Sequence, residues 1–115
     1  MNKEFSQLPQ VAFCILLALS LRERHGYEII KQVQEDSNGK INLGPGALYT
    51  SIKQLRERGL ILEVVHKDDI RRRYYKLSGD GAQALEEQLR YYDNVVSLAQ
   101  KRKLLNGILA HGQAA

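Results

Sequence analysis

Apolar residues recur at the three-to-four spacing of an α-helix over four stretches of this chain. The first predicted helix, 8–21, is apolar nearly all round, which indicates that both of its sides are buried. The second, 26–36, and the third, 45–58, are amphipathic, and Pro45 and Gly59 suit the start and the end of the third. Their predicted core positions are Tyr27, Ile29, Ile30 and Val33, followed by Leu48, Ile52 and Leu55.

A change of pattern after the third helix predicts a β-hairpin. Residues 60–67 are rich in aliphatic and β-branched side chains, residues 72–77 alternate, and residues 68–71 form the predicted turn. Because successive side chains of a strand point to opposite faces, the second strand has an outer and an inner face. The outer face is predicted to carry Arg72, Tyr74 and Lys76, and the inner face Tyr75 and Leu77.

The last predicted helix, 80–106, begins at a cap formed by Ser78 or Asp80. Two neighbouring apolar stripes run along it, and together they are wider than one small core requires. The first stripe consists of Leu85, Leu89, Tyr92, Val96 and Ala99, and the second of Tyr91, Val95, Leu98 and Leu105. A second chain that covers the spare stripe is favoured over a longer contact with the first helix of the same chain.

Three helices, a basic hairpin and a long helix, in that order, are typical of a winged helix-turn-helix protein. The predicted fold class is therefore mainly α with a small β-hairpin (α+β), extended by a C-terminal dimerisation helix. The predicted organisation is a winged helix-turn-helix domain at 1–78, a dimerisation helix at 79–107 and a flexible tail at 108–115.

The distribution of charge along the chain indicates a negatively charged partner. The chain has 115 residues and a formal net charge of +4, and residues 53–76 carry this whole excess. A localised basic excess favours a surface that faces phosphates, with a solvated basic face as the alternative. The apolar run 11–19 is too short to span a bilayer and follows no signal-peptide pattern, so we expect a cytoplasmic protein without membrane contact.

The face of the third helix opposite its core positions suits the major groove of DNA. Thr50 and Gln54 can read base edges, Lys53 can reach a base or a phosphate, and the hydroxyl of Tyr49 suits a phosphate. Three consecutive arginines beside the hairpin turn favour contact with the DNA backbone over a merely charged strand edge. The predicted DNA contacts are Ala47, Tyr49, Thr50, Lys53, Gln54, Lys67, Arg71, Arg72 and Arg73.

Catalytic and metal-binding patterns are missing from the sequence. No glycine-rich phosphate loop, catalytic triad or carboxylate pair stands out. His25, His66 and His111 fall in three different segments, and none has a ligand partner at helical spacing. Cys14, the single cysteine, excludes an internal disulfide and suits the core. We therefore expect no enzyme, no metal and no cofactor.

Several short motifs, in this order and at this spacing, resemble those of the PadR-like transcriptional regulators. They are Gly26-Tyr27-Glu28-Ile29-Ile30, Pro45-Gly46-Ala47-Leu48-Tyr49, Leu55 through Gly59-Leu60-Ile61, and Arg73-Tyr74-Tyr75-Lys76-Leu77-Ser78 with Gly81. The resemblance covers about residues 8–85. It implies a repressor that binds double-stranded DNA at a palindromic operator as a homodimer. A winged-helix dimer that binds another protein instead of DNA is the alternative.

The resemblance also implies which residues join two chains and what releases the DNA. The dimer would form through the first and the last helix, at Val11, Ile15, Leu89, Tyr92, Val96 and Ala99. Regulators of this kind respond to small aromatic effectors, which some relatives hold between tryptophans. This chain has no tryptophan, so Tyr91 and Tyr92 are the only aromatic substitutes in its last helix.

Overall fold

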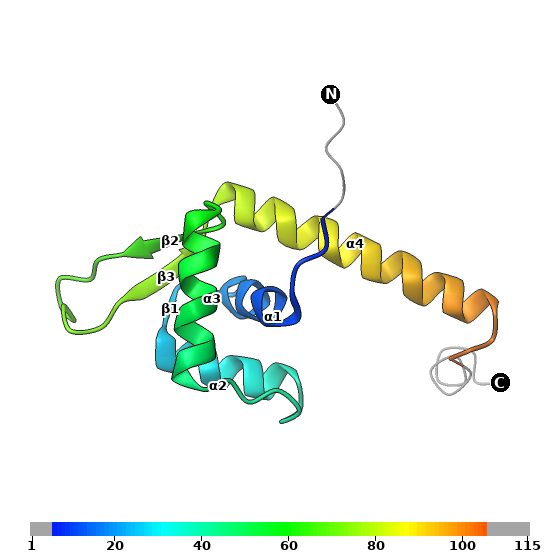
Figure 1. Ribbon diagram of the computed structural model, residues 1–115, viewed down its shortest axis with the longest axis horizontal. Coiled ribbons are helices and arrows are strands. Elements are labelled where there is room, and N and C mark those ends of the chain that lie inside the picture. Colours follow the sequence, from blue (N-terminus) through cyan, green and yellow to red (C-terminus); the bar gives the residue numbers. More distant parts are fainter. Residues whose placement is uncertain (1–5, 106–115) are drawn as a thin grey trace.

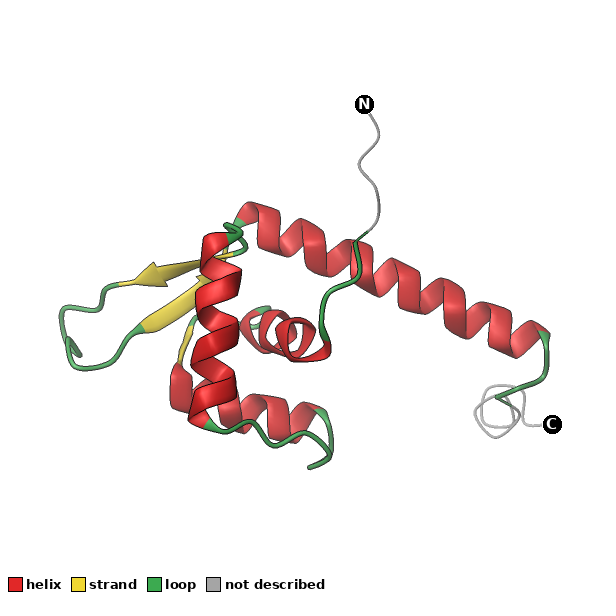
Figure 2. Ribbon diagram, in the orientation of Figure 1, coloured by secondary structure: helices red, strands yellow, loops and turns green. Residues whose placement is uncertain are grey.

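The computed structural model describes residues 6–105 and confirms the mainly α architecture with a small sheet (Figure 1). The elements are α1 (Gln10–Leu19), β1 (Arg24–His25), α2 (Gly26–Asp36), α3 (Pro45–Glu57), β2 (Ile61–Val64), β3 (Tyr74–Leu77) and α4 (Gly79–Lys101). The four predicted helices are present, and the first begins and ends two residues inside its predicted bounds. Figure 2 shows the hairpin at one end of the molecule and α4 running past the other helices.

Helix α1 lies at the centre of the core and contacts α2, α3, α4 and β3. Ile15 and Leu16 are fully buried there, and they meet Ile29 of α2 and Leu48 of α3 in one apolar cluster. The three predicted core positions of α3, 48, 52 and 55, are all buried, so its exposed face is fixed by the same periodicity.

The sheet has three antiparallel strands in the order β1-β3-β2, and the sequence predicted only two of them. The additional strand, β1, has two residues, and Arg24 pairs with Tyr75 while His25 pairs with Tyr74. The side chain of Arg24 is buried because its Nε donates to the carbonyl of Ala18, 2.8 Å away. This strand attaches the start of α2 to the hairpin.

The hairpin strands are shorter than predicted. β2 ends at Val64 and β3 begins at Tyr74, so the loop between them, 65–73, contains all three arginines. The physical reason is that this loop forms turn hydrogen bonds of its own, from Asp69 N to His66 O and from Arg72 N to Asp69 O. Arg72 and Arg73 therefore lie outside the strand, and their side chains do not alternate between its two faces. Tyr75 and Lys76 lie within the strand and do alternate.

The prediction that Tyr27 faces the core is wrong, since this side chain is 66% exposed. Ile29 and Val33 occupy the buried face of α2, and Tyr27 in the first turn lies outside it. Its ring stacks loosely on the His25 ring at 6.5 Å between centroids, and Lys31 Nζ lies 5.6 Å from its centroid. Tyr27 therefore belongs to the surface beside the hairpin.

Helix α4 begins at the cap formed by Ser78, whose hydroxyl accepts from Gly81 N at 2.9 Å and donates to Gly59 O at 2.6 Å. Its first half packs on the domain, where buried Gln88 accepts from the backbone N–H of Leu8 at 2.6 Å. It ends at Lys101 instead of 106, because Lys103 adopts a left-handed conformation and Leu104 N bonds to Ala99 O. The predicted tail, 108–115, lies outside the described residues.

Candidate nucleic-acid interface

The exposed face of α3 carries the residues that the sequence singled out for DNA contact. Ala47, Tyr49, Thr50, Lys53 and Gln54 are all exposed. Gly44 and Pro45 start the helix without a side-chain cap, so no side chain occupies the backbone N–H groups of its first turn. A small polar surface with free donors at one helix end can approach a nucleic-acid groove closely.

The arginines of the hairpin loop are exposed, but they differ in their partners. Arg73 Nε lies 4.0 Å from Glu63 Oε2, and Arg72 lies near Asp69 and His25. Arg71, like Lys53 and Lys67, forms no ion pair with any residue of 6–105. These three cations are therefore available to phosphates without first breaking an internal pair.

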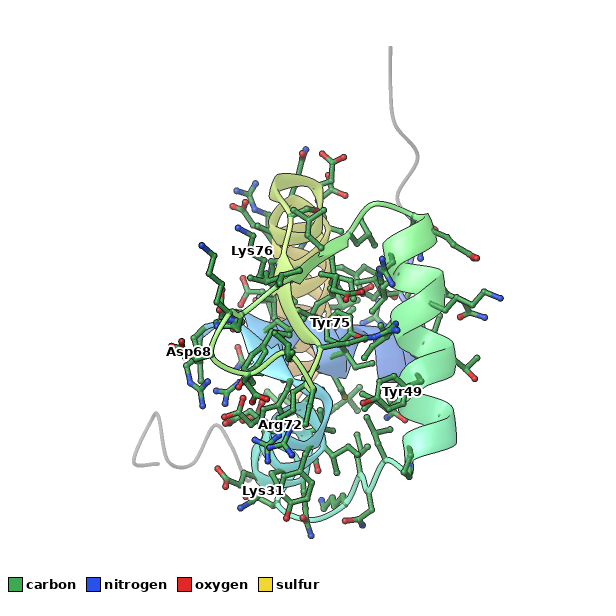
Figure 3. The ribbon with its side chains drawn as sticks, turned by 90° about the vertical axis from the view of Figure 1, so that its left-hand side faces the viewer. Lys31, Tyr49, Asp68, Arg72, Tyr75 and Lys76 are labelled. Atoms are coloured by element: carbon green, nitrogen blue, oxygen red, sulfur yellow. The ribbon has the colours of Figure 1, made fainter. Side chains whose placement is uncertain are left out.

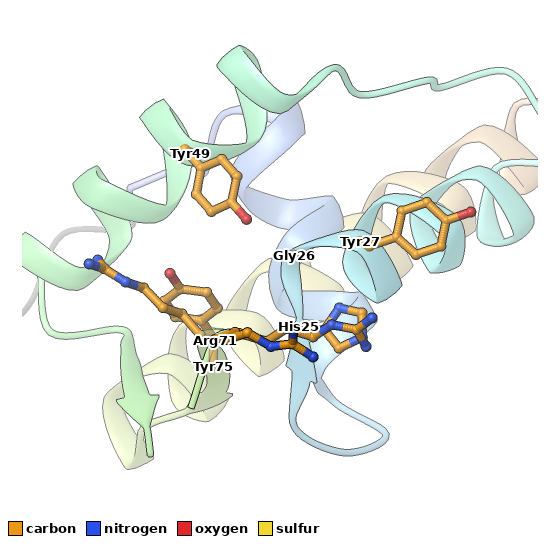
Figure 4. A pocket seen from close by; sticks show the side chains of 8 residues that line it. His25, Gly26, Tyr27, Tyr49, Arg71 and Tyr75 are labelled. Carbon is orange, nitrogen blue, oxygen red and sulfur yellow. The ribbon is translucent and has the colours of Figure 1, made fainter. Parts of the chain in front are cut away.

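A hollow of about 390 Å³ joins α3, the start of α2 and the hairpin (Figures 3 and 4). It is lined by His25, Gly26, Tyr27, Tyr49, Arg71, Arg72, Arg73 and Tyr75. Tyr49 points from α3 across the hollow towards Gly26, and a Cβ at position 26 would overlap its hydroxyl. The glycine therefore makes room for Tyr49, and the hollow combines aromatic rings with guanidinium groups, a combination that suits nucleic acid.

A second hollow, of about 540 Å³, continues this surface along α3. Lys53, Arg56 and Arg73 line it together with the rings of Tyr49 and Tyr75. Arg56 is paired with Glu63 at 3.1 Å, which also lies beside Arg73. Glu63 thus lies between an arginine of the helix and an arginine of the hairpin loop, a role that the sequence did not suggest because charge along a chain does not reveal which opposite charges meet.

A polar network at the start of α2 was also missed. His25 is buried and caps α2: its backbone N–H donates to Glu28 Oε1 at 3.1 Å, and its Nδ1 accepts from Glu28 N at 3.4 Å. Arg22 Nη2 donates to the other oxygen of Glu28 at 3.2 Å. The spacing of His25 and Glu28 matches a capping box, and this was the signal available in the sequence.

The charge of Glu28 is stabilised within this network. Partial burial by itself would raise the pKa of Glu28. The hydrogen bonds from Arg22 and from the backbone of His25, together with the charge of Arg22, outweigh burial and hold the pKa below the ordinary value of 4.5. The folded protein therefore favours the carboxylate form.

Replacing Glu28 with glutamine should cost about 0.5 kcal/mol of folding stability at pH 7, since the shape of the capping box remains and only the charge is lost. A lowered pKa means that the stabilisation is present above the ordinary value of 4.5 and disappears as the pH falls through the folded-state value. Urea unfolding of both proteins across this range measures the difference. Glu87→Gln, on an exposed carboxylate without an ion pair among residues 6–105, is the control. A Glu28→Gln deficit that does not change with pH would contradict the charge argument.

The residues predicted for dimer contact are not equally accessible. Leu89 and Val96 are 42% and 40% exposed, Val11 and Ala99 are half-buried, and half-buried Tyr92 packs edge-on against Phe13 with centroids 5.2 Å apart. Ile15 is fully buried inside the single chain, so it has no surface left for a partner. The prediction for Ile15 is therefore corrected to a core role, while the other five line one side of α1 and α4.

Within residues 6–105, no group of histidine, cysteine and acidic side chains is arranged to hold a metal ion. His111 lies outside the described residues. In the same part of the chain, no helix has both the length and the apolar character that crossing a bilayer requires. Cys14 is half-buried beside the core, and burial followed by the charge of Asp36 raises the pKa of its thiol.

Comparison with known proteins shows where this architecture recurs. Residues 15–87 match the model of the transcriptional regulator PadR-like family. Transcriptional regulator YqjI of Escherichia coli is 32% identical over 78 residues, which are 68% of this chain and 37% of that protein. The chain thus spans little more than a third of the length of this curated relative.

Solved structures share the fold at lower identity. A PadR family transcription regulator from Clostridium difficile superposes with a TM-score of 0.71 at 24% identity, covering 81% of this chain and 97% of that one. Bacillus subtilis PadR in complex with operator DNA superposes with a TM-score of 0.60 at 23% identity, covering 70% of this chain and 47% of that one. These neighbours identify the fold as that of winged-helix regulators.

Proposed function

The chain belongs to the transcriptional regulator PadR-like family, and from that membership we propose that it represses transcription by binding a palindromic operator as a homodimer. The family and the matched relative are transcriptional regulators and not enzymes. The observation that carries the proposal is the hollow in which the exposed side of α3, the start of α2 and the three arginines of the hairpin meet. The DNA-bound neighbour adds support by fold.

In this proposal, α3 enters the major groove and the hairpin lies along the backbone. Thr50 and Gln54 meet base edges, and Lys53 meets a base or an adjacent phosphate. Arg71 and Lys67, which form no ion pair among the described residues, meet phosphates beside the groove. Tyr49, which faces the hollow, offers its hydroxyl to the phosphate between the helix and the hairpin.

A homodimer would place two copies of α3 on the DNA. The apolar side of α4 continues beyond its contact with α1, and α1 itself is only half-buried on the side that carries Val11. A second copy covers both surfaces at once and aligns two α3 helices with half-sites one helical turn apart, about 34–36 Å. The proposed division into a DNA-binding domain at 1–78 and a dimerisation helix at 79–107 follows from this arrangement.

Equilibrium binding to a mixed-sequence duplex at two salt concentrations tests the proposal. Contacts with several phosphates predict a loss of affinity of at least about a hundredfold between 50 and 200 mM salt. Absence of binding at low salt, or binding that does not depend on salt, would overturn the proposal and favour a winged-helix dimer that binds a protein. Selection of bound duplexes from a random pool would then identify the operator and show whether it is palindromic.

Lys53→Ala should weaken duplex binding about tenfold and leave the dimer intact, because one base or phosphate contact is lost from each exposed α3 face. Fluorescence anisotropy measures the affinity, and sedimentation measures the dimer. The matched control is Lys101→Ala, which removes the same charge from the far end of α4. Equal losses in both variants would indicate a general charge effect instead of a contact.

We further propose that a small aromatic effector binds in a hollow of about 270 Å³ where α1, α2 and α4 meet. Its walls are mainly apolar and are formed by Gln10, Phe13, Cys14, Leu17, Val33, Asp36, Ser37, Ile41 and Tyr92. The hollow adjoins the surface proposed for the dimer, so a ligand there can alter the spacing of the two α3 helices.

Titration of phenol, an uncharged small aromatic compound, into the protein–duplex complex should release the DNA from the unmodified chain. Cys14→Phe, which fills the hollow with a further ring beside Phe13 and Tyr92, should bind the duplex normally and lose this response. Anisotropy of the labelled duplex measures both. Release that is equally efficient in Cys14→Phe would place the effector elsewhere.

A further inference from the structure

Arg72 is the one arginine of the hairpin loop with a hydrogen bond or ion pair to a residue outside the hairpin, among residues 6–105. Its Nη1 lies 3.1 Å from His25 Nε2, and its Nε lies 3.7 Å from Asp69 Oδ2. Its side chain is nevertheless 61% exposed, so the rest of the guanidinium group faces outwards beside the hollow. Figure 3 shows Arg72 below the hairpin loop, on the side away from α3, which carries Tyr49.

His25 is a rigid support for that arginine. It is only 7% exposed, its backbone pairs with Tyr74 of β3, and it caps α2. The Tyr74 ring meets the imidazole edge-on with centroids 5.3 Å apart. Tyr74 in turn donates from its hydroxyl to Asp69 at 3.3 Å, so the second contact of Arg72 is fixed as well.

Two donors compete for the single lone pair of the His25 imidazole, while the nearest carboxylate oxygen, Glu28 Oε1, lies 3.6 Å from Nε2, beyond hydrogen-bond distance. Arg72 donates to Nε2 over 3.1 Å, and the backbone N–H of Glu28 donates to Nδ1 over 3.4 Å. A neutral imidazole carries one free lone pair, so it can accept only one of these bonds at a time. The bond from Arg72 is shorter and charge-assisted, which makes it the stronger of the two. Glu28 keeps its bond from the backbone of His25 in either case.

We propose that His25 is a positioning residue for DNA binding, whose Nε2 lone pair holds Arg72 ready for a backbone phosphate. The inference rests on the proposed function and names how this site is organised. Arginine loses many rotamers when it binds, and an arginine that is already held loses fewer. The expected gain is about fivefold in the affinity of the dimer for duplex DNA.

The tautomer of His25 gives a test that needs no DNA. Nitrogen-correlated NMR of the imidazole near neutral pH should show the proton on Nδ1 and the lone pair on Nε2. In Arg72→Ala, the proton should move to Nε2, because Nδ1 then accepts from Glu28 N. A proton on Nε2 in the unmodified protein, a doubly protonated ring, or a tautomer that Arg72→Ala does not change would each overturn the proposal.

A double-mutant cycle on a mixed-sequence duplex tests the consequence for DNA. His25→Asn keeps a good helix cap and removes the acceptor for Arg72. It should weaken binding about fivefold in the unmodified chain and have no effect in Arg72→Ala. Equal weakening in both backgrounds would mean that His25 acts only through the fold, and stronger binding would mean that it restrains Arg72 from the DNA.

The tautomer measurement and the double-mutant cycle together distinguish a failure of the proposed function from a failure of the role of His25. If the unmodified chain binds no duplex, the proposed function fails, and the tautomer still decides whether His25 holds Arg72. If the chain binds duplex DNA and either arm gives an opposing result, only the role of His25 fails. Thermal unfolding of His25→Asn shows whether its cap has survived.

Discussion

Gly81→Ala is expected to destabilise the domain by about 3 kcal/mol or more, because a side chain at this position has no room. A Cβ at Gly81 would overlap the carbonyl oxygen of Leu60 and lie 2.9 Å from its carbonyl carbon. Both atoms are backbone, and the same carbonyl accepts a hydrogen bond from Ser78 N at 3.1 Å. Neither partner can move without separating α4 from β2. Urea unfolding of Gly81→Ala against the unmodified chain measures the loss.

Gly79→Ala is the matched control for this substitution. It lies in the same first turn of α4, and nothing lies within 4 Å of a Cβ built there. Removing glycine from a helix lowers the entropy of the unfolded chain, so this variant should gain about 0.5 kcal/mol. A similar loss in both variants would show that the cap of α4, and not the contact with Leu60, is sensitive to substitution.

Elements that depend on local pattern were predicted well. The core positions of α3 follow from helical spacing alone, and Gly59 adopts the left-handed conformation expected of a helix end. The end of α4 was not predicted correctly. Its left-handed residue is Lys103, and a lysine, unlike glycine or asparagine, does not mark a helix end in the sequence. The sequence therefore predicts the presence of a helix more reliably than the residue at which the helix ends.

Features that depend on distant partners were not predictable in this way. β1 has only two residues, which is too short for any alternation, and its partner β3 lies about fifty residues later. Because β1 was not predicted, neither the burial of His25 nor its contact with Arg72 could be predicted. Glu63, the shared partner of Arg56 and Arg73, was missed because charge along the sequence does not reveal which opposite charges meet.

The candidate interface was predicted in its residues but not in its shape. Periodicity placed Thr50, Lys53 and Gln54 on the exposed face of α3. The hollow between α3 and the hairpin depends on Gly26, which makes room for Tyr49, and on the turn that carries Arg71 outside the strands. The sequence therefore predicts which residues form the candidate interface. The shape of that interface depends on the conformation of the hairpin loop and of the start of α2.

Val96→Glu is expected to convert the proposed dimer into a monomer and to weaken duplex binding about a hundredfold. Val96 is exposed on α4, whose C-terminal part runs past the other helices (Figure 1), and a second copy would bury it. A carboxylate in that contact would be desolvated without a partner. The loss of DNA affinity follows because each α3 would then bind its half-site alone, without the effective concentration that a dimer provides. Sedimentation and duplex titration measure the two effects.

Asn94→Glu separates the loss of the interface from the added charge. It introduces the same carboxylate on α4, at an exposed position on the side opposite Leu85, Leu89 and Val96 by helical spacing. This variant should remain dimeric and lose little affinity for DNA, since its charge lies away from the stripe of Leu89 and Val96 and away from α3. If Val96→Glu stays dimeric, the second copy does not use the stripe of Leu89 and Val96, and the proposed interface is wrong. If Val96→Glu becomes monomeric but binds DNA unchanged, the dimer exists and the operator does not require it.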